Sequence, residues 1–166
     1  MNNFDYEKIA EKLIYRLKNG GIFLVGKQDD ITNVMTIGYA ALGRIWKKPI
    51  VTIAVKRSRF TFDLINNTGR FTITIPNTDM KEILKLCGTS SGRDCNKFNE
   101  FNLKLNESKE IDTPVLDVPG IHCECKVLYK NELTPNDLSE DLKRDEYLDN
   151  EYHVLFFGEI LNYYNN

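Results

Sequence analysis

Short runs rich in β-branched and alternating apolar residues recur along this chain, and glycine, proline or polar turn residues bound each of them. Such runs are typical of β-strands. Regular crossover helices do not separate them, and no Gly-x-Gly-x-x-Gly motif follows a run, which disfavours a doubly wound parallel sheet. The pattern predicts a mainly β fold with short helices, built as a mostly antiparallel barrel. The predicted strands cover residues 22–25, 33–42, 50–55, 71–75, 121–129 and 153–161.

Helical spacing of apolar residues predicts an N-terminal amphipathic helix over residues 4–18, which ends at Gly20 and Gly21. Shorter helices are predicted over 58–67, from a cap at Thr78, and over 95–101. Residues 103–120 have an irregular pattern, and 133–149 favour a surface helix. The 166 residues fit one domain, with the barrel over about residues 21–161.

Composition narrows the class of protein. The apolar fraction is 42% and the charged fraction 28%, both ordinary for a soluble globular chain. The formal net charge of −2 provides no positive field for nucleic acid. The sequence shows no targeting signal and no run near the roughly 18 apolar residues that span a bilayer. We therefore expect a cytoplasmic protein that binds neither membrane nor nucleic acid.

The four cysteines do not have the spacing of a zinc site, because Cys87 and Cys95 are eight residues apart and Cys123 and Cys125 two apart. Cys123 and Cys125 alternate within a predicted strand and so share one face. We expect buried thiols that act as small apolar groups, and no metal.

A compact basic cluster follows the predicted strand at 50–55. It contains Lys56, Arg57, Ser58, Arg59 and Thr61. Cations and hydroxyls that alternate at the end of a buried strand can hold a phosphate group. If Ser58 opens the next helix, the free N–H groups of that helix point at the same place.

Two further segments carry polar groups that suit a ligand. One is Asn33-Val34-Met35-Thr36, at the start of a predicted strand. The other is the loop from Ser90 to Phe98, which reads SSGRDCNKF. Its glycine allows close approach of the backbone to a ligand, and its hydroxyls and Lys97 are donors.

Taken together, the three segments resemble the flavin reductase-like family of FMN-binding split barrels, the group that includes the flavoredoxins. That family shows an Asn-x-Met-Thr strand, a Ser-x-(Tyr/Phe)-Thr element and a Ser-Gly-Arg-Asp-x-(Asp/Asn)-Lys-Phe loop, and this chain has all three in order. The resemblance extends from about Gly21 to Ile160. It implies an antiparallel split β-barrel that binds FMN.

The resemblance also implies roles for individual residues. The isoalloxazine ring would lie along Asn33, Val34, Met35, Thr36 and Ile37. The phosphate would be held by Lys56, Ser58, Arg59 and Thr61, with Phe60 between them in the same element. Further contacts would come from Ser91, Gly92, Lys97, His153 and Tyr39, the last in place of a tryptophan that relatives often carry.

The function implied is an FMN-dependent oxidoreductase that takes electrons from NAD(P)H or from a protein partner. The sequence shows no acid–base or nucleophile constellation, which agrees with chemistry carried out by the cofactor. An FMN-binding electron carrier or sensor without nicotinamide turnover is the alternative. A barrel that binds single-stranded nucleic acid through Arg57, Arg59, Phe60 and Phe62 is disfavoured by the net charge. The family also implies a homodimer with the flavin near the interface.

Overall fold

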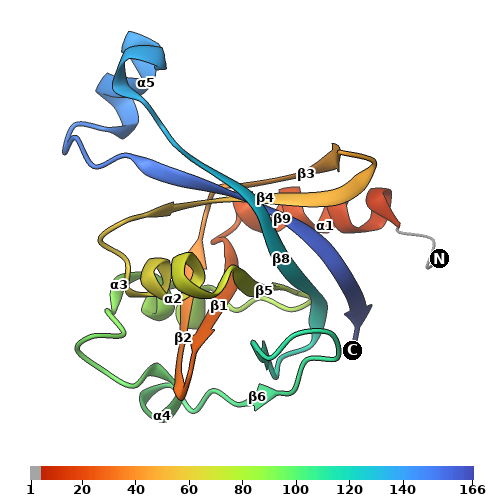
Figure 1. The fold of residues 1–166 in the computed structure, drawn as a ribbon. Coiled ribbons are helices and arrows are strands. Elements are labelled where there is room, and N and C mark those ends of the chain that lie inside the picture. Colours follow the sequence, from red (N-terminus) through yellow and green to blue (C-terminus); the bar gives the residue numbers. More distant parts are fainter. Residues whose placement is uncertain (1–4) are drawn as a thin grey trace.

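The computed structural model describes residues 5–166, which form an antiparallel sheet and short helices (Figure 1). The helices are α1 (Tyr6–Lys18), α2 (Phe60–Thr68), α3 (Lys81–Thr89), α4 (Lys97–Glu100), the 3₁₀ turn η1 (Pro135–Asp137) and α5 (Glu140–Glu146). The strands are β1 (Ile22–Gln28), β2 (Ile31–Ile37), β3 (Ala40–Ile45), β4 (Lys48–Lys56), β5 (Arg70–Pro76), β6 (Leu105–Asn106), β7 (Val115–Leu116), β8 (Gly120–Glu132) and β9 (His153–Asn165).

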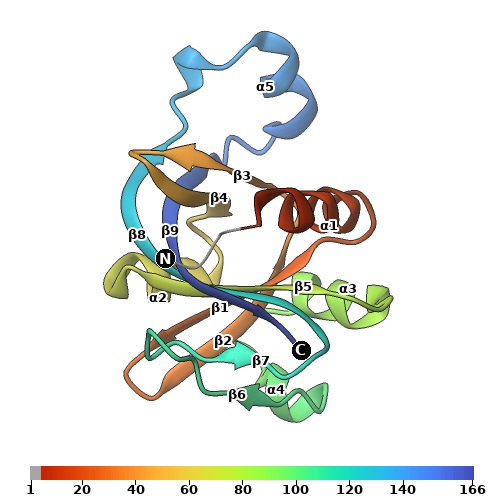
Figure 2. The same ribbon diagram turned by 90° about the vertical axis from the view of Figure 1, so that its right-hand side faces the viewer.

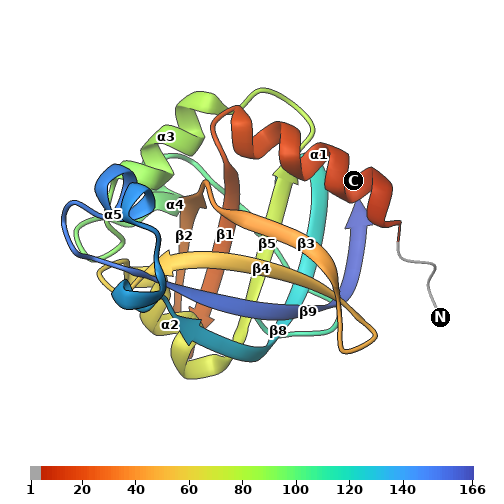
Figure 3. The ribbon, with the colours of Figure 1, turned by 90° about the horizontal axis from the view of Figure 1, so that it is seen from above.

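Seven of the strands in this part of the chain form one sheet in the order β2-β1-β5-β8-β9-β4-β3, and all neighbours in it are antiparallel. Figure 3 shows how the sheet curls, so that β1, β2 and β5 run across the direction of β3, β4 and β9. Within residues 5–166 no ladder joins the edge strands β2 and β3, so the barrel is not closed. The predicted antiparallel split barrel is therefore confirmed.

The predicted strand 33–42 is wrong in one respect, because the structure divides it into β2 and β3. The chain bends at Gly38 and Tyr39 and passes from one edge of the sheet to the other. The turn between β3 and β4 is also shorter than predicted. Trp46 and Lys47 both have positive φ, at 53° and 61°, and between them they reverse the chain in two residues. Pro49 therefore lies inside β4, opposite Arg44.

Helices α1, α2 and α3 pack against the sheet. Asp5 is the N-cap of α1. Residue 4, where the sequence predicts the start of this helix, lies outside the described residues. Ile9 and Leu13 of α1 are buried in the main core, as the amphipathic pattern predicts. A second apolar cluster lies under α3 and contains Phe23, Val34 and Leu84. Among residues 5–166, no helix has both the length and the apolar character to cross a membrane.

Several predicted boundaries differ from the structure. Helix α3 begins after Met80, so Thr78 is not its cap, and α4 is limited to four residues after its cap at Asn96. Strand β9 continues to Asn165, beyond the predicted end at 161. The segment 103–120 is mostly irregular, as predicted, apart from β6 and β7. In Figure 2 this hairpin lies at the opposite end of the molecule from α5.

Candidate functional site

Strand β2 and the first turn of α2 are joined by a buried hydrogen bond. The Nδ2 of Asn33 donates to the Oγ1 of Thr61 over 2.8 Å. Asn33 is 4% exposed and Thr61 is fully buried. Alternation along β2 places Met35 and Ile37 on the same side as Asn33. The strand and the helix thereby form two walls of one site.

Helix α2 begins at Phe60, and its N-cap residue is Arg59 with extended backbone. The prediction that Ser58 opens this helix is therefore wrong, since Ser58 lies one residue before the cap. The guanidinium of Arg59 turns inward and donates to the carbonyl of Gly88 in the last turn of α3. It therefore lies between the two helices.

A narrow cavity of about 110 Å³ lies where these elements meet, and we call it the hydroxyl pocket. Besides Thr61, four hydroxyl-bearing residues line it: Ser58, Thr89, Ser90 and Ser91. The remaining lining residues are Asn33, Met35, Arg59, Phe60, Thr61, Gly92 and Lys97. Hydroxyls and a guanidinium around a small cavity provide the donors that an anion requires.

Only glycine fits at position 92. A Cβ there would lie 2.3 Å from the Oδ1 of Asn33 and 2.6 Å from a ring carbon of Phe60. The loop therefore approaches β2 and α2 as closely as a backbone can. This contact fixes the shape of the hydroxyl pocket on the side of the loop.

Lys97 is buried, with 2% of its surface exposed. Its Nζ donates to the carbonyls of Val34, over 2.9 Å, and Cys87, over 2.7 Å. Burial lowers the pKa of this ammonium group. Lys97 thus ties the loop to β2 and α3, while the Val34 side chain lies in the cluster under α3.

A wider cavity of about 430 Å³ adjoins the hydroxyl pocket, and we call it the β2–β4 pocket. Met35 and Arg59 line both cavities. The other lining residues are Leu17, Thr36, Ile37, Gly38, Tyr39, Ala54, Val55, Lys56, Gly88 and His153. Tyr39 and His153 meet edge to face there, with ring centroids 5.4 Å apart. Burial, and then the charge of Lys56, lower the pKa of His153.

The basic cluster does not converge on one point. Lys56 pairs with Asp149 over 2.7 Å, and Arg57 makes a two-pronged contact with Glu132, over 2.8 Å at each nitrogen. The hydrogen bond to Asp149 raises the pKa of Lys56. Of these cations, Arg59 lines the hydroxyl pocket, whereas Lys56 lines the β2–β4 pocket.

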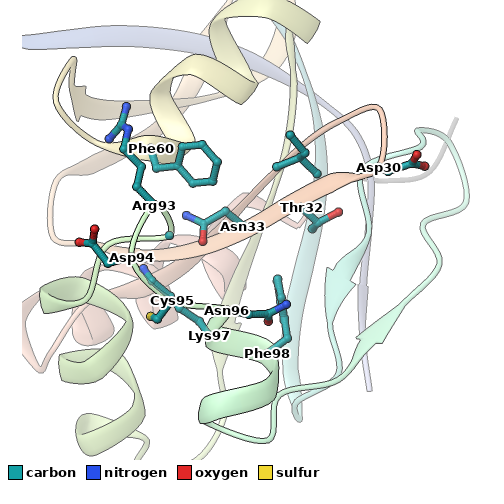
Figure 4. A pocket seen from close by; sticks show the side chains of 12 residues that line it. Asp30, Thr32, Asn33, Phe60, Arg93, Asp94, Cys95, Asn96, Lys97 and Phe98 are labelled. Carbon is teal, nitrogen blue, oxygen red and sulfur yellow. The ribbon is translucent and has the colours of Figure 1, made fainter.

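A third cavity, of about 440 Å³, lies on the outer side of the loop and is shown in Figure 4. Asn33, Phe60, Gly92 and Lys97 line both it and the hydroxyl pocket. Figure 4 shows Asn33 and Phe60 facing one another above the loop. The two cavities therefore adjoin at these four residues.

The structure brings nearly all of the predicted site residues together. All except Val34 line the hydroxyl pocket or the β2–β4 pocket. Sequence reasoning missed Thr89, the last residue of α3, and the contacts that residues 146–151 make from the end of α5 onward. The signal for the latter was the excess of acidic residues at 137–151, opposite in sign to the cluster at 56–59.

The chain is similar to several known proteins. A protein of Archaeoglobus fulgidus, named only as uncharacterized, is 28% identical over 130 residues, which are 78% of this chain and 63% of the relative. The chain thus spans less than two thirds of that relative's length. Flavoredoxin from Methanosarcina acetivorans superposes with a TM-score of 0.69 at 20% identity, covering 88% of this chain and 68% of that one.

An FMN-binding protein from Thermus thermophilus with bound 1-cyclohex-2-enone gives a TM-score of 0.66 at 17% identity, over 87% of this chain and 68% of that one. At these identities the structures show a shared fold. The family model described as "Flavin reductase like domain" matches residues 16–166. That range contains β2, the basic cluster and the loop at 90–98. The chain therefore belongs to the flavin reductase-like family.

Proposed function

We propose that this chain binds FMN and works as a flavin-dependent oxidoreductase, with electrons supplied by a nicotinamide nucleotide or by a redox partner protein. Membership of the flavin reductase-like family supports the use of a flavin. The observation that carries the choice of FMN is the pair of adjoining cavities that share Met35 and Arg59. A wide cavity joined to a narrow, donor-lined one suits a flat ring system with a phosphate at the end of a flexible chain.

The residues of the site fit such a ligand. Gly92 forms a cradle that a Cβ would fill, since its neighbour Asn33 would then lie only 2.3 Å away. Arg59 and the hydroxyls of Ser58, Ser90 and Ser91 are donors for a phosphate in the hydroxyl pocket. We place the phosphate there, with Arg59 as its cation, and the ring beside β2 in the β2–β4 pocket.

FMN, when bound, supplies the acceptance and release of electrons, which no side chain here could perform. The chain's own residues then bind, orient and shield. Met35, Thr36 and Ile37 of β2 lie beside the ring, and Asn33 lies at the hydroxyl pocket. Tyr39 and His153 form an aromatic wall at the mouth of the pocket. Because burial lowers the pKa of His153, its imidazole is neutral at pH 7.

We also propose a homodimer, and the flavin near its interface is what the family resemblance implies. Trp46 and Tyr129 are exposed at 53% and 50%, large fractions for aromatic side chains. They meet with ring centroids 6.5 Å apart at the β3–β4 turn. An exposed apolar cluster of this kind supports contact with a second copy. Light scattering coupled to gel filtration gives the mass in solution, and the proposal expects twice the chain mass. The cytoplasmic location stays a prediction.

Titration of the purified protein with FMN tests the proposal, followed by anaerobic addition of NADH or NADPH. We expect saturable FMN binding and bleaching of the flavin by at least one nucleotide. Gly92→Ala should weaken FMN binding because its Cβ collides with Asn33, whereas Gly43→Ala, with open space around its Cβ, should not. FMN binding without reduction by either nucleotide would favour the electron carrier or sensor instead.

A further inference from the structure

The segment between β8 and β9, residues 133–152, forms an arm that extends beyond the barrel in Figure 1 and carries α5 at its tip. The part from the end of α5 onward returns to the body and lies against the candidate site. Four hydrogen bonds fasten it there. They join Tyr39 Oη to Glu146 Oε2 (2.5 Å), Lys56 Nζ to Asp149 Oδ2 (2.7 Å), the Ser58 amide to Glu151 Oε1 (3.0 Å) and Tyr147 Oη to His153 Nδ1 (2.9 Å).

Two of these contacts involve groups suited to binding an anion. The Lys56 ammonium and the Ser58 amide are donors at the end of β4, beside the two pockets. Asp149 and Glu151 occupy both of them, and Glu151 also lies 3.8 Å from the Lys56 nitrogen. A phosphate that accepts a hydrogen bond from either donor must displace a carboxylate. A phosphate that accepts from neither donor still lies near the two negative charges of Asp149 and Glu151, which repel it.

We propose that Asp149 and Glu151 act as an internal anion that competes with the phosphate of the ligand, so that the arm limits the affinity for FMN and favours its exchange. This inference rests on the proposed function. The side chains of Asp149 and Glu151 are 55% and 35% exposed, so their pairs with Lys56 are screened by water and easily opened. The competition is therefore a modulation of affinity and does not block the site.

The size of the effect follows from the exposure of the two contacts. Each exposed charged contact changes an equilibrium by about twofold to fivefold. Neutralising both carboxylates releases Lys56 and the Ser58 amide, so the two factors multiply and FMN should bind about fourfold to 25-fold more tightly. Riboflavin has the same ring and no phosphate, so it carries no charge for these donors to attract, and its affinity should change by less than about twofold.

The test compares dissociation constants for FMN and riboflavin in three proteins: the native chain, the variant D149N/E151Q and the control E140Q/D141N. The control removes the same two charges from the start of α5, where the side chains are 88% and 81% exposed and pair with Lys143 and Arg144. We expect only D149N/E151Q to bind FMN more tightly, with riboflavin unchanged. Hydrogen exchange on the native chain should also show faster exchange of residues 146–151 with FMN than with riboflavin.

Three results would overturn the role of the arm. They are an FMN affinity that D149N/E151Q leaves unchanged, an equal increase in the riboflavin affinity of this variant, or the same increase in FMN affinity in the control. Each of these leaves the binding of FMN itself in place. Failure of all three proteins to bind either flavin would instead contradict the proposed function, and the arm's role with it.

Discussion

The amide of Asn33 and the hydroxyl of Thr61, 28 positions apart in the chain, meet in a buried hydrogen bond of 2.8 Å. This bond holds β2 against the first turn of α2, and both residues line the hydroxyl pocket. The distance between β2 and α2 therefore depends on two side chains from different sequence motifs. Asn33 belongs to the Asn-x-Met-Thr strand, and Thr61 belongs to the Ser-x-(Tyr/Phe)-Thr element. The structure explains why the Asn-x-Met-Thr strand and the threonine after the basic cluster occur together.

Thr61→Val should lower the free energy of unfolding by about 1–3 kcal/mol, because it leaves the buried amide of Asn33 without its acceptor at nearly constant volume. Urea denaturation at neutral pH measures the change. Thr52→Val is the matched control. Thr52 is a half-buried strand threonine whose hydroxyl has no hydrogen-bond partner among residues 5–166, and its substitution should change stability by less than about 0.5 kcal/mol. Equal effects of the two substitutions would contradict the role of the bond.

Lys97→Met should destabilise the fold by about 1–3 kcal/mol, since it leaves the buried carbonyls of Val34 and Cys87 without a donor. FMN affinity should fall with it, because the loop at 90–98 loses its tie to β2. Lys104→Met, at an exposed position, serves as the control. A fully stable Lys97→Met protein would show that the buried ammonium group does not hold the loop in place.

Arg59→Gln should weaken FMN binding by about tenfold or more, since a charged hydrogen bond to the phosphate is lost. Riboflavin affinity should change much less. Arg57→Gln removes the same charge two residues earlier, where the guanidinium points away to Glu132, and should leave FMN binding close to native. Isothermal titration of both flavins separates the cases. A larger loss for Arg57→Gln would move the phosphate out of the hydroxyl pocket.

Stability should decrease as the pH falls below about 6.5, the ordinary pKa of histidine. Burial lowers the pKa of His122, whose ring contacts Thr74 over 3.0 Å and Asn166 over 2.8 Å. The unfolded chain therefore binds its proton at a higher pH than the folded chain does, and acid favours unfolding. Urea midpoints between about pH 7.5 and 5.5 measure the slope. His122→Gln should flatten it, and an unchanged slope would assign the effect to other groups.

The sequence predicts most strands because alternation and β-branched residues persist through β4, β5 and β9. It misses the break between β2 and β3, since Gly38 and Tyr39 interrupt no apolar pattern. The two-residue turn at Trp46 and Lys47 is also missed, because its positive φ values occur without the asparagine and glycine that usually mark such turns.

In the candidate site, the motifs identify the right segments and misjudge some side chains. Val34 points into the cluster under α3, and the Lys97 ammonium donates hydrogen bonds to two backbone carbonyls. Neither orientation can be predicted from a linear motif. The contacts of Asp149 and Glu151 are long-range pairs, 93 positions from their partners Lys56 and Ser58. Only the opposite charges of the two segments hint at them.

The proposed function requires that a flavin with a phosphate fits the joined pockets that share Met35 and Arg59. Equilibrium titration of the purified native protein with FMN and riboflavin tests this requirement. We expect saturable binding of both, with FMN the tighter ligand because Arg59 and the surrounding hydroxyls contact its phosphate. Absence of FMN binding, or riboflavin bound as tightly as FMN, would contradict it.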